Sequence, residues 1–303
     1  MIGCLMTDNA ATIETSDTAL RAADHDFTVR TYPAPTPNGT MLVWAHGGAF
    51  VFGELAMPEA DLTARELAAR GTTVVSVDYT LAPGEVISLL PAPDIEGMPT
   101  PEQLIAVGGD RPRAPFPVAS LQLVAAFDWA QQNAARFGAD PLRVGIGGAS
   151  AGGNLAGGAA LRLRDRGTSP ARTVLVYPVL HATVPAPDAE LAAIIAQLPA
   201  GMGFPPEITK ALNENYLGGH SAADPYAFPG GHDLTGLTPT LVITAHQDEL
   251  RPSGEAYAAE LEVAGVVAQL VDEPNMHGFL NAPGDPSAVR SYDRIAAFLA
   301  DEV

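Results

Sequence analysis

The chain has 303 residues, 47% of them hydrophobic and 17% charged, and its formal net charge is −19 because 35 acidic residues outnumber 16 basic ones. This length allows one large α/β domain or two modest domains. The shortage of basic residues and the lack of a basic run argue against nucleic acid and against an anionic membrane surface as partners.

The sequence contains one cysteine, Cys4, which excludes an internal disulfide and a cysteine-based metal cluster. No apolar run is long enough to span a bilayer. The opening "MIGCLMTDNA" lacks the basic and hydrophobic regions of a signal peptide. We therefore expect a cytoplasmic protein without stable membrane association.

Short apolar runs bounded by glycine or proline alternate along the chain with longer segments of helical periodicity. The runs predict buried strands at 27–32, 41–45, 72–78, 143–148, 173–178, 240–245 and 268–273. The periodic segments predict helices at 58–70, 119–137, 152–166, 252–264 and 286–301. This alternation predicts one α/β domain over residues 1–303, with a mainly parallel central sheet flanked by helices.

Two stretches interrupt this alternation. Residues 84–115 are rich in proline and glycine, and residues 181–225 combine the amphipathic "DAELAAIIAQL" with loops and "EITKALNENYL". Long excursions from a compact sheet commonly form lids or binding loops. We expect 181–225 to supply a cap.

The segment 148–152, "GASAG", matches G-x-S-x-G between a predicted buried strand and a predicted helix. In this context the pattern is typical of a nucleophile elbow, which exposes the serine hydroxyl above the sheet. A dinucleotide fingerprint would need glycine in place of Ser150. A P-loop would need a Gly-Lys pair, and the only lysine, Lys210, lies elsewhere. Ser150 is therefore the candidate nucleophile.

A serine nucleophile needs a base, and the base needs an orienting acid. Asp248 follows the predicted strand 240–245, and His277 follows the last predicted strand. The order Ser, Asp, His is the one expected for an elbow of this kind. Glu249 remains an alternative acid, whereas His246 lies too close to Asp248 in sequence to be its oriented partner.

The segment "WAHGGAFVFG" (44–53) follows the second predicted strand. Successive glycines allow backbone N–H groups to converge on a developing oxyanion. We expect donors from Gly47, Gly48 and Ala49 on one side and from Ala151 on the other. His46 is interpreted as a brace for this turn.

The sequence resembles the hormone-sensitive-lipase-like branch of the α/β-hydrolase esterases. The matching stretches are "HGGAF", "VDYTLAP", "FPVASLQLVAAFDWA", "GASAGGNLA", "DPYAFP", "LTPTLVITAHQDELRPSGEAYAAEL" and "MHGF". The resemblance implies an α/β-hydrolase fold with a helical cap, a catalytic triad of Ser150, Asp248 and His277, and an oxyanion hole built from the amides named above.

The chain departs from the family pattern at several positions. Ala49 stands where the family has a third glycine, and Ala149 stands where the family has an acid before the nucleophile. Thr80 replaces the usual arginine, and about thirty extra residues separate "YTLAP" from "PFPVA". We hypothesise that this insertion, 84–115, substitutes for part of the cap, with the N-terminal segment also near the pocket.

These observations predict a serine carboxylic ester hydrolase that forms an acyl-enzyme and needs no metal or cofactor. The resemblance implies small esters with short or medium acyl chains. An amidase, a deacetylase or an acyl-transfer tailoring enzyme would use the same triad. A non-catalytic binding module on the same scaffold is a further alternative, although no triad member is missing. A homodimer is left open.

Overall fold

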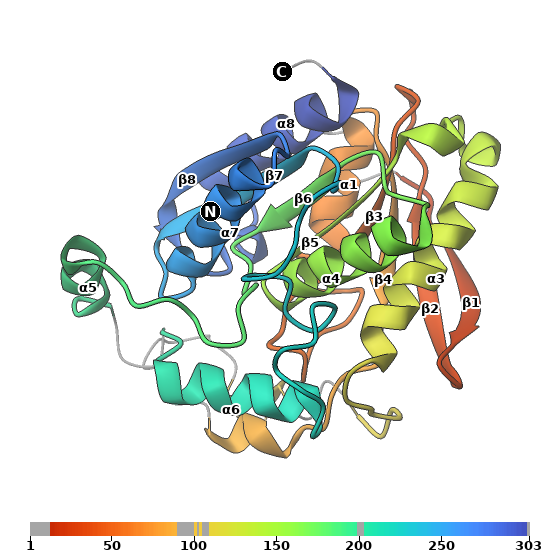
Figure 1. The fold of residues 1–303 in the computed structure, drawn as a ribbon. Coiled ribbons are helices and arrows are strands. Elements are labelled where there is room, and N and C mark those ends of the chain that lie inside the picture. The colour runs from red at the N-terminus through yellow and green to blue at the C-terminus, as the bar shows by residue number, and fades with distance from the viewer. Residues whose placement is uncertain (1–12, 90–99, 102, 105–108, 199–202, 302–303) are drawn as a thin grey trace, which may run out of the picture.

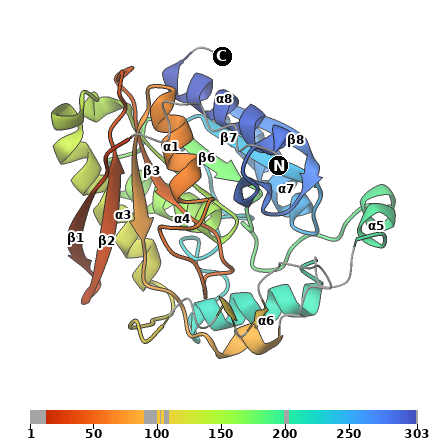
Figure 2. The same ribbon diagram turned by 180° about the vertical axis from the view of Figure 1, so that it is seen from behind.

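The computed structural model describes residues 13–89, 100–101, 103–104, 109–198 and 203–301. Within these ranges the chain forms one eight-stranded sheet with the strand order β1-β2-β4-β3-β5-β6-β7-β8. Helices cover both faces of this sheet (Figures 1 and 2). Cys4, the rest of the N-terminal segment and part of the 84–115 insertion lie outside the described residues.

All seven predicted strands are present. They are β2 (His25–Tyr32), β3 (Met41–Ala45), β4 (Thr73–Asp78), β5 (Val144–Ala149), β6 (Thr173–Val176), β7 (Thr240–Gln247) and β8 (Ala268–Met276). The strands from β4 across to β8 pair in parallel, and β2 runs antiparallel to β4. The predicted α/β-hydrolase architecture, with a mainly parallel sheet, is confirmed.

The sequence did not predict β1 (Ser16–Ala22), which pairs antiparallel with β2 at one edge of the sheet. One face of β1 is exposed, and the other is only partly buried, with Leu20 and Ala22 against the core. Leu20 is the one large apolar side chain of this strand, so the alternation that reveals half-buried strands is too weak to detect in its sequence.

The five predicted helices are also present, as α1 (Asp61–Ala69), α3 (Val118–Asn133), α4 (Ala151–Arg166), α7 (Arg251–Val263) and α8 (Pro286–Ala300). The last turn expected for α3 is a separate 3-10 helix, η2 (Ala134–Phe137). Two shorter 3-10 helices, η3 (Pro141–Arg143) and η4 (Phe279–Asn281), follow later in the chain. No helix among the described residues has both the length and the apolar character needed to cross a membrane.

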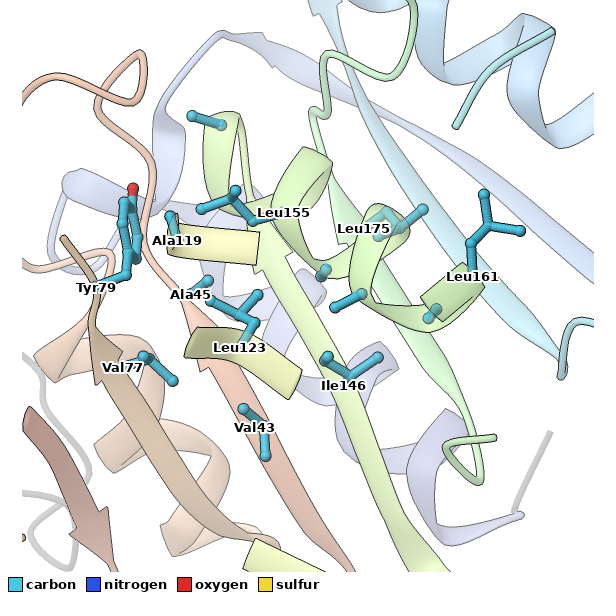
Figure 3. Close-up of a cluster of buried hydrophobic side chains, with 14 of the residues drawn as sticks. Val43, Ala45, Val77, Tyr79, Ala119, Leu123, Ile146, Leu155, Leu161 and Leu175 are labelled. Carbon is cyan, nitrogen blue, oxygen red and sulfur yellow. The ribbon is translucent and has the colours of Figure 1, made fainter. Parts of the chain in front are cut away.

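The strands have alternating faces because successive side chains of a strand point to opposite sides of a sheet. In β3, Met41, Val43 and Ala45 belong to one buried cluster, and Leu42 and Trp44 belong to another. The first cluster packs against α3, α4 and α7, and the second against α1 and α8. Figure 3 shows part of the first cluster, where helix side chains meet Val43 and Ile146.

The segment 181–225 contains α5 (Ala189–Ile195) and α6 (Pro206–Leu217). Asp188 begins α5 by accepting a hydrogen bond of 2.8 Å from the N–H of Leu191. In both ribbon views α6 lies across the carboxyl ends of the parallel strands (Figures 1 and 2). The 3-10 helix η1 (Glu85–Leu89), from the start of the insertion, contacts α6.

Candidate active site

Ser150 lies in the sharp turn between β5 and α4. Its backbone has φ 53° and ψ −120°, a conformation that is unfavourable for a residue with a side chain. The turn is held because the Ser150 N–H donates to the Val176 carbonyl at 2.9 Å. A Cβ atom on Gly152 would lie 2.1 Å from the Ala45 carbonyl oxygen, so only glycine fits there. These contacts hold the hydroxyl above the sheet.

The structure brings the three predicted catalytic side chains together. Nε2 of His277 lies 2.9 Å from Oγ of Ser150, and Nδ1 of His277 lies 2.7 Å from Oδ2 of Asp248. The Asp248 side chain is 1% exposed, and its second oxygen accepts the N–H of Leu250 at 2.9 Å. With Nδ1–H donating to Asp248, Nε2 is free to accept the serine proton.

The environment of His277 favours its protonated form. Burial lowers the pKa of the imidazole, but the charge of Asp248 and the hydrogen bond to it raise the pKa more, and Glu59 adds to this rise. The net effect places the pKa of His277 above its ordinary value of 6.5. The rings of Tyr177 and Phe204 each lie 4.8 Å from the imidazole and restrict its orientation.

The predicted oxyanion segment adopts an unusual backbone. Gly48, Ala49 and Phe50 have successive φ angles of 113°, 50° and 66°. A Cβ atom on Gly48 would lie 2.0 Å from the Phe52 carbonyl oxygen. The N–H of Phe52 in turn donates to the Gly48 carbonyl at 3.0 Å. Among the described residues, the N–H groups of Gly48 and Ala49 donate to no other group.

Gly47 differs from the other predicted oxyanion donors, because its N–H donates to the carboxylate of Glu59. A donor that already has a buried acceptor is not available to a substrate oxygen. Three of the four predicted amides therefore remain as candidates, those of Gly48, Ala49 and Ala151. Ala151 is the first residue of α4, where the N–H has no acceptor within the helix.

His46 has the bracing position expected from the sequence. It is fully buried, its ring stacks on Tyr79 at 4.5 Å, and its Nδ1 lies 2.7 Å from the Gly47 carbonyl oxygen. The hydroxyl of Tyr79 donates to the His46 carbonyl at 2.9 Å.

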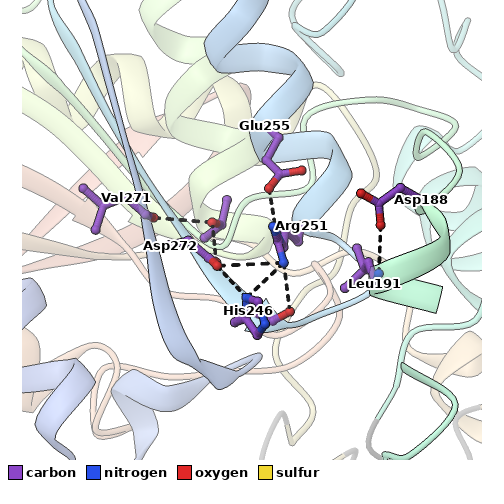
Figure 4. Close-up of polar contacts among 8 residues, drawn as sticks. Asp188, Leu191, His246, Arg251, Glu255, Val271 and Asp272 are labelled. Atoms are coloured by element: carbon purple, nitrogen blue, oxygen red, sulfur yellow. Dashed lines mark hydrogen bonds and ion pairs between the residues drawn. The ribbon is translucent and has the colours of Figure 1, made fainter. Parts of the chain in front are cut away.

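His246 and Glu249, the alternatives near Asp248, lie apart from the nucleophile. Nδ1 of His246 lies 2.7 Å from Oδ2 of Asp272, beside the Arg251 guanidinium, as Figure 4 shows. Glu249 packs against Gly203 and Phe204, and burial raises the pKa of its carboxyl. Only Asp248 contacts the ring nitrogen of His277 among these residues.

A second serine and histidine pair is present at the start of segment 181–225. Oγ of Ser253 lies 2.9 Å from Nδ1 of His181, whose Nε2 lies 3.1 Å from Glu260. Ser253 is fully buried, and its oxygen also accepts the backbone N–H groups of Leu180 and His181. This cluster ties the segment to α7, and its hydroxyl has no access to a substrate.

A small cavity of about 20 Å³ lies at Ser150. Its lining is mostly apolar and comes from the 47–53 turn, from α6 and the residues just before it, and from the turns after β6 and β7: Ala49, Phe50, Val179, Phe204, Thr209, Leu212, Asn213 and Leu250. A larger cavity of about 220 Å³ lies beside β2 and β4 and does not include Ser150. In the described part of the chain, no group of three His, Cys, Asp or Glu side chains could hold a metal ion.

A model of an alpha/beta hydrolase fold family matches residues 42–89 and 111–281. The chain belongs to this family. The match omits 90–110, which is most of the insertion expected from the sequence. The resemblance stated from the motifs is therefore confirmed at the level of the family.

The chain is similar to named esterases along most of its length. It is 31% identical to carboxylesterase NlhH of Mycobacterium tuberculosis over 264 residues, covering 84% of this chain and 72% of the relative. It is 30% identical to the carboxylic ester hydrolase LipN of the same organism, covering 95% and 70%. The enzyme class predicted from the sequence, a hydrolase of the carboxylesterase type, agrees with these relatives.

Solved structures give the same result. The thermostable carboxylesterase EstE1, cloned from a metagenomic library, superposes with a TM-score of 0.76 at 30% identity, over 95% of this chain and 88% of that one. An esterase of Pyrobaculum calidifontis superposes with a TM-score of 0.74 at 29% identity, over 97% and 87%.

Proposed function

We propose that this protein is a serine carboxylic ester hydrolase with Ser150 as nucleophile, His277 as general base and acid, and Asp248 as the orienting acid. The observation that carries the proposal is the continuous chain of contacts from Ser150 Oγ through His277 to Asp248, at 2.9 and 2.7 Å. Similarity to named carboxylesterases supports ester bonds as the substrate.

In the first half of the reaction, Oγ of Ser150 attacks the carbonyl carbon while Nε2 of His277 takes the hydroxyl proton. Asp248 stabilises the imidazolium through Nδ1–H. The tetrahedral intermediate collapses, His277 gives the proton to the leaving alkoxide, and an acyl-enzyme remains. Water then attacks the acyl carbon with His277 again as base, which releases the acid and restores Ser150.

In this proposal the N–H groups of Gly48, Ala49 and Ala151 stabilise the negative charge that develops on the carbonyl oxygen of the substrate. These N–H groups belong to two turns that meet at Ser150, so they approach the oxygen from two sides. Fixed donors of this kind stabilise the transition state without reorganisation, and loss of one donor typically costs about 10²–10³ in kcat.

The preferred substrate is a small ester with a short or medium acyl chain. The cavity at Ser150 is mostly apolar, and aromatic side chains of Phe50 and Phe204 form part of its wall. An acyl chain bound at Ser150 would lie against this apolar wall. Apolar lining also excludes water from the reacting centre.

Segment 181–225 is assigned the role of cap in this proposal, because Phe204 and three residues of α6 line the cavity. The described ends of the 84–115 insertion adjoin the same region. η1 contacts α6, Arg113 donates to the Val51 carbonyl, and Asn215 of α6 donates to the Pro83 carbonyl at 2.8 Å. These contacts support the hypothesis that the insertion completes the cap.

The test is hydrolysis of p-nitrophenyl esters of increasing acyl length, compared with matched anilides, by the wild type and by Ser150→Ala. We expect hydrolysis of acetyl and butyryl esters that Ser150→Ala abolishes. Mass mapping after incubation with a fluorophosphonate should give an adduct at Ser150 and none at the buried Ser253. Cleavage of the anilides in preference to the esters would assign an amidase instead, and the absence of an adduct would contradict catalysis.

A further inference from the structure

Glu59 is a buried carboxylate behind the candidate active site, and no motif in the sequence indicated it. It is 2% exposed and lies two residues before the start of α1, next to the N-cap residue Ala60. One oxygen accepts the N–H of Gly47, and the other accepts the Tyr177 hydroxyl at 2.6 Å and the Asn281 amide at 3.4 Å. Its backbone is fixed too, because the Trp44 indole donates to the Glu59 carbonyl at 2.9 Å.

All the partners of this carboxylate are neutral donors. Among the described residues, no arginine or lysine forms an ion pair with Glu59. A buried carboxylate without a cation is unfavourable unless hydrogen bonds compensate for its lost hydration. Such a group therefore requires an explanation beyond the packing of the fold.

Each of the three donors belongs to a different part of the site. Gly47 begins the turn that carries Gly48 and Ala49, and Tyr177 lies with its ring against His277. Asn281 follows His277 in the same loop. A Cβ atom on Gly47 would lie 2.6 Å from the Glu59 carboxylate and 3.0 Å from the Cβ of Ser150, so both groups lie against the side of Gly47 on which a side chain would project.

The turn after Gly47 needs outside support. Ala49 and Phe50 have positive φ angles, and conformations of this kind persist only where surrounding contacts determine them. The residue before the nucleophile supplies no such contact, because Ala149 is fully buried in the apolar cluster that includes Tyr177. The Glu59 carboxylate reaches the turn from that same side.

We propose that Glu59 is a positioning residue, which fixes the oxyanion turn through the Gly47 amide and supplies, behind His277, the negative charge that Ala149 cannot supply. This inference rests on the proposed function. The charged and titratable groups that face His277 are Asp248, Glu59 and the Tyr177 hydroxyl. Those that face Glu59 are Tyr177, His46, Tyr79 and Tyr292.

The experiment compares Glu59→Gln, Glu59→Asp and the wild type on p-nitrophenyl acetate, with Glu262→Gln as the charge-matched control on the exposed face of α7. Rates are divided by the active-site concentration from fluorophosphonate titration, so that unfolded protein does not contribute. Because the charge of Glu59 raises the pKa of His277, its loss moves the acidic limb of kcat/KM to lower pH.

For Glu59→Gln we expect kcat to fall by about 10- to 100-fold with KM nearly unchanged, since a displaced donor acts on the transition state. We also expect its acidic limb to move to lower pH. Glu59→Asp keeps the charge, so its limb should stay near that of the wild type while kcat falls, because the shorter side chain displaces the turn. Glu262→Gln should match the wild type.

A titrated Glu59→Gln enzyme with the wild-type kcat and acidic limb would overturn the inference. A poorly folded variant would still report through the pH midpoint, which the amount of folded enzyme does not change. If Glu59→Gln cannot be purified, a Glu59→Asp enzyme with both kcat and limb unchanged would overturn the inference equally. Failure of the proposed function would be seen separately, as a wild type no more active than Ser150→Ala.

Discussion

The imidazole of His277 and the carboxylate of Asp248 face each other at 2.7 Å, with the carboxylate 1% exposed. The two residues come from the turns after β7 and β8, which are neighbouring parallel strands. Parallel neighbours end at the same edge of a sheet, so a pair separated by 29 residues in sequence meets without a long connection. Several expected effects depend on this contact.

Replacement of Asp248 by asparagine should leave the fold intact and remove most of the activity. An amide can present its N–H₂ to Nδ1, which favours the tautomer that has its proton on Nε2 and cannot accept from Ser150. We expect kcat to fall by roughly 10⁴-fold, the magnitude for this exchange in a serine protease triad. Steady-state kinetics and circular dichroism check this, and a loss below tenfold would exclude Asp248 as the orienting acid.

The pH dependence of kcat/KM should report the raised pKa of His277. The neutral imidazole is the active base, so activity falls as pH decreases through this pKa. Because Asp248 and Glu59 raise it above 6.5 despite burial, the acidic midpoint should lie above pH 6.5. In Asp248→Asn the effect of burial dominates, and the midpoint should fall below that of the wild type. An acidic midpoint that is the same in Asp248→Asn as in the wild type would contradict Asp248 as the cause of the raised His277 pKa.

Ala49 is expected to tolerate glycine and to reject valine. Its φ of 50° is unfavourable for a residue with a Cβ, and most unfavourable for a β-branched one. Ala49→Gly keeps the N–H, so kcat should stay within about threefold of the wild type, and the free energy of unfolding should be unchanged or slightly higher. Ala49→Val should lower kcat by more than about tenfold.

Ala135→Gly is the matched control for Ala49→Gly. Ala135 is exposed in the 3-10 helix η2, outside the positions with positive φ. Glycine there adds only chain entropy to the unfolded state and should cost about 0.5–1 kcal/mol. If both glycine variants lose the same stability in denaturant titrations, the conformation assigned to Ala49 is wrong.

The sequence was sufficient for seven of the eight strands in the described sheet and for the three candidate catalytic residues, because each depends on local pattern. Buried parallel strands are continuous apolar runs, and the side chains of Ser150, Asp248 and His277 each follow such a run. β1 was missed because its inner face is only partly buried and carries one large apolar side chain, Leu20. With so weak an apolar alternation, the sequence of an edge strand resembles a loop.

Glu59 could not be found by local pattern. It lies at the start of a predicted helix, where an acidic residue favours the helix dipole and needs no further explanation. Its partners Tyr177 and Asn281 are 118 and 222 residues away in sequence. The Glu59 carboxylate also accepts the N–H of Gly47, so this amide is no longer available as one of the predicted oxyanion donors. Only the packing of α1 against the sheet brings these groups together.

Arg113, near the end of the 84–115 insertion, should prove necessary for the oxyanion turn. Its Nη1 donates to the Val51 carbonyl at 2.7 Å and to the Ala82 carbonyl at 2.8 Å. Arg111 adds a bond from Nη2 to the Gly53 carbonyl at 3.0 Å, and it also pairs with Asp78. The insertion thus holds the end of the 47–53 turn, at Val51 and Gly53, whereas Glu59 holds its start at Gly47.

Loss of the Arg113 guanidinium leaves both carbonyls without this donor. Since the side chain is partly exposed, water can replace some of the loss, and Arg113→Ala should lower the free energy of unfolding by about 1–2 kcal/mol. Displacement of the strained turn should also lower kcat by about tenfold. Arg294→Ala, on the exposed face of α8, removes the same charge far from the turn and should change neither quantity.

Arg113→Lys separates charge from geometry. Both hydrogen bonds come from one nitrogen, Nη1, and a lysine ammonium also carries several N–H donors but stands on a shorter side chain. We expect Arg113→Lys to recover part of the stability and less of the kcat, because the shorter side chain draws the Val51 carbonyl out of position. Denaturant titration and kinetics on p-nitrophenyl acetate measure the two effects. Wild-type kcat in Arg113→Ala would mean that the turn keeps its conformation without the insertion.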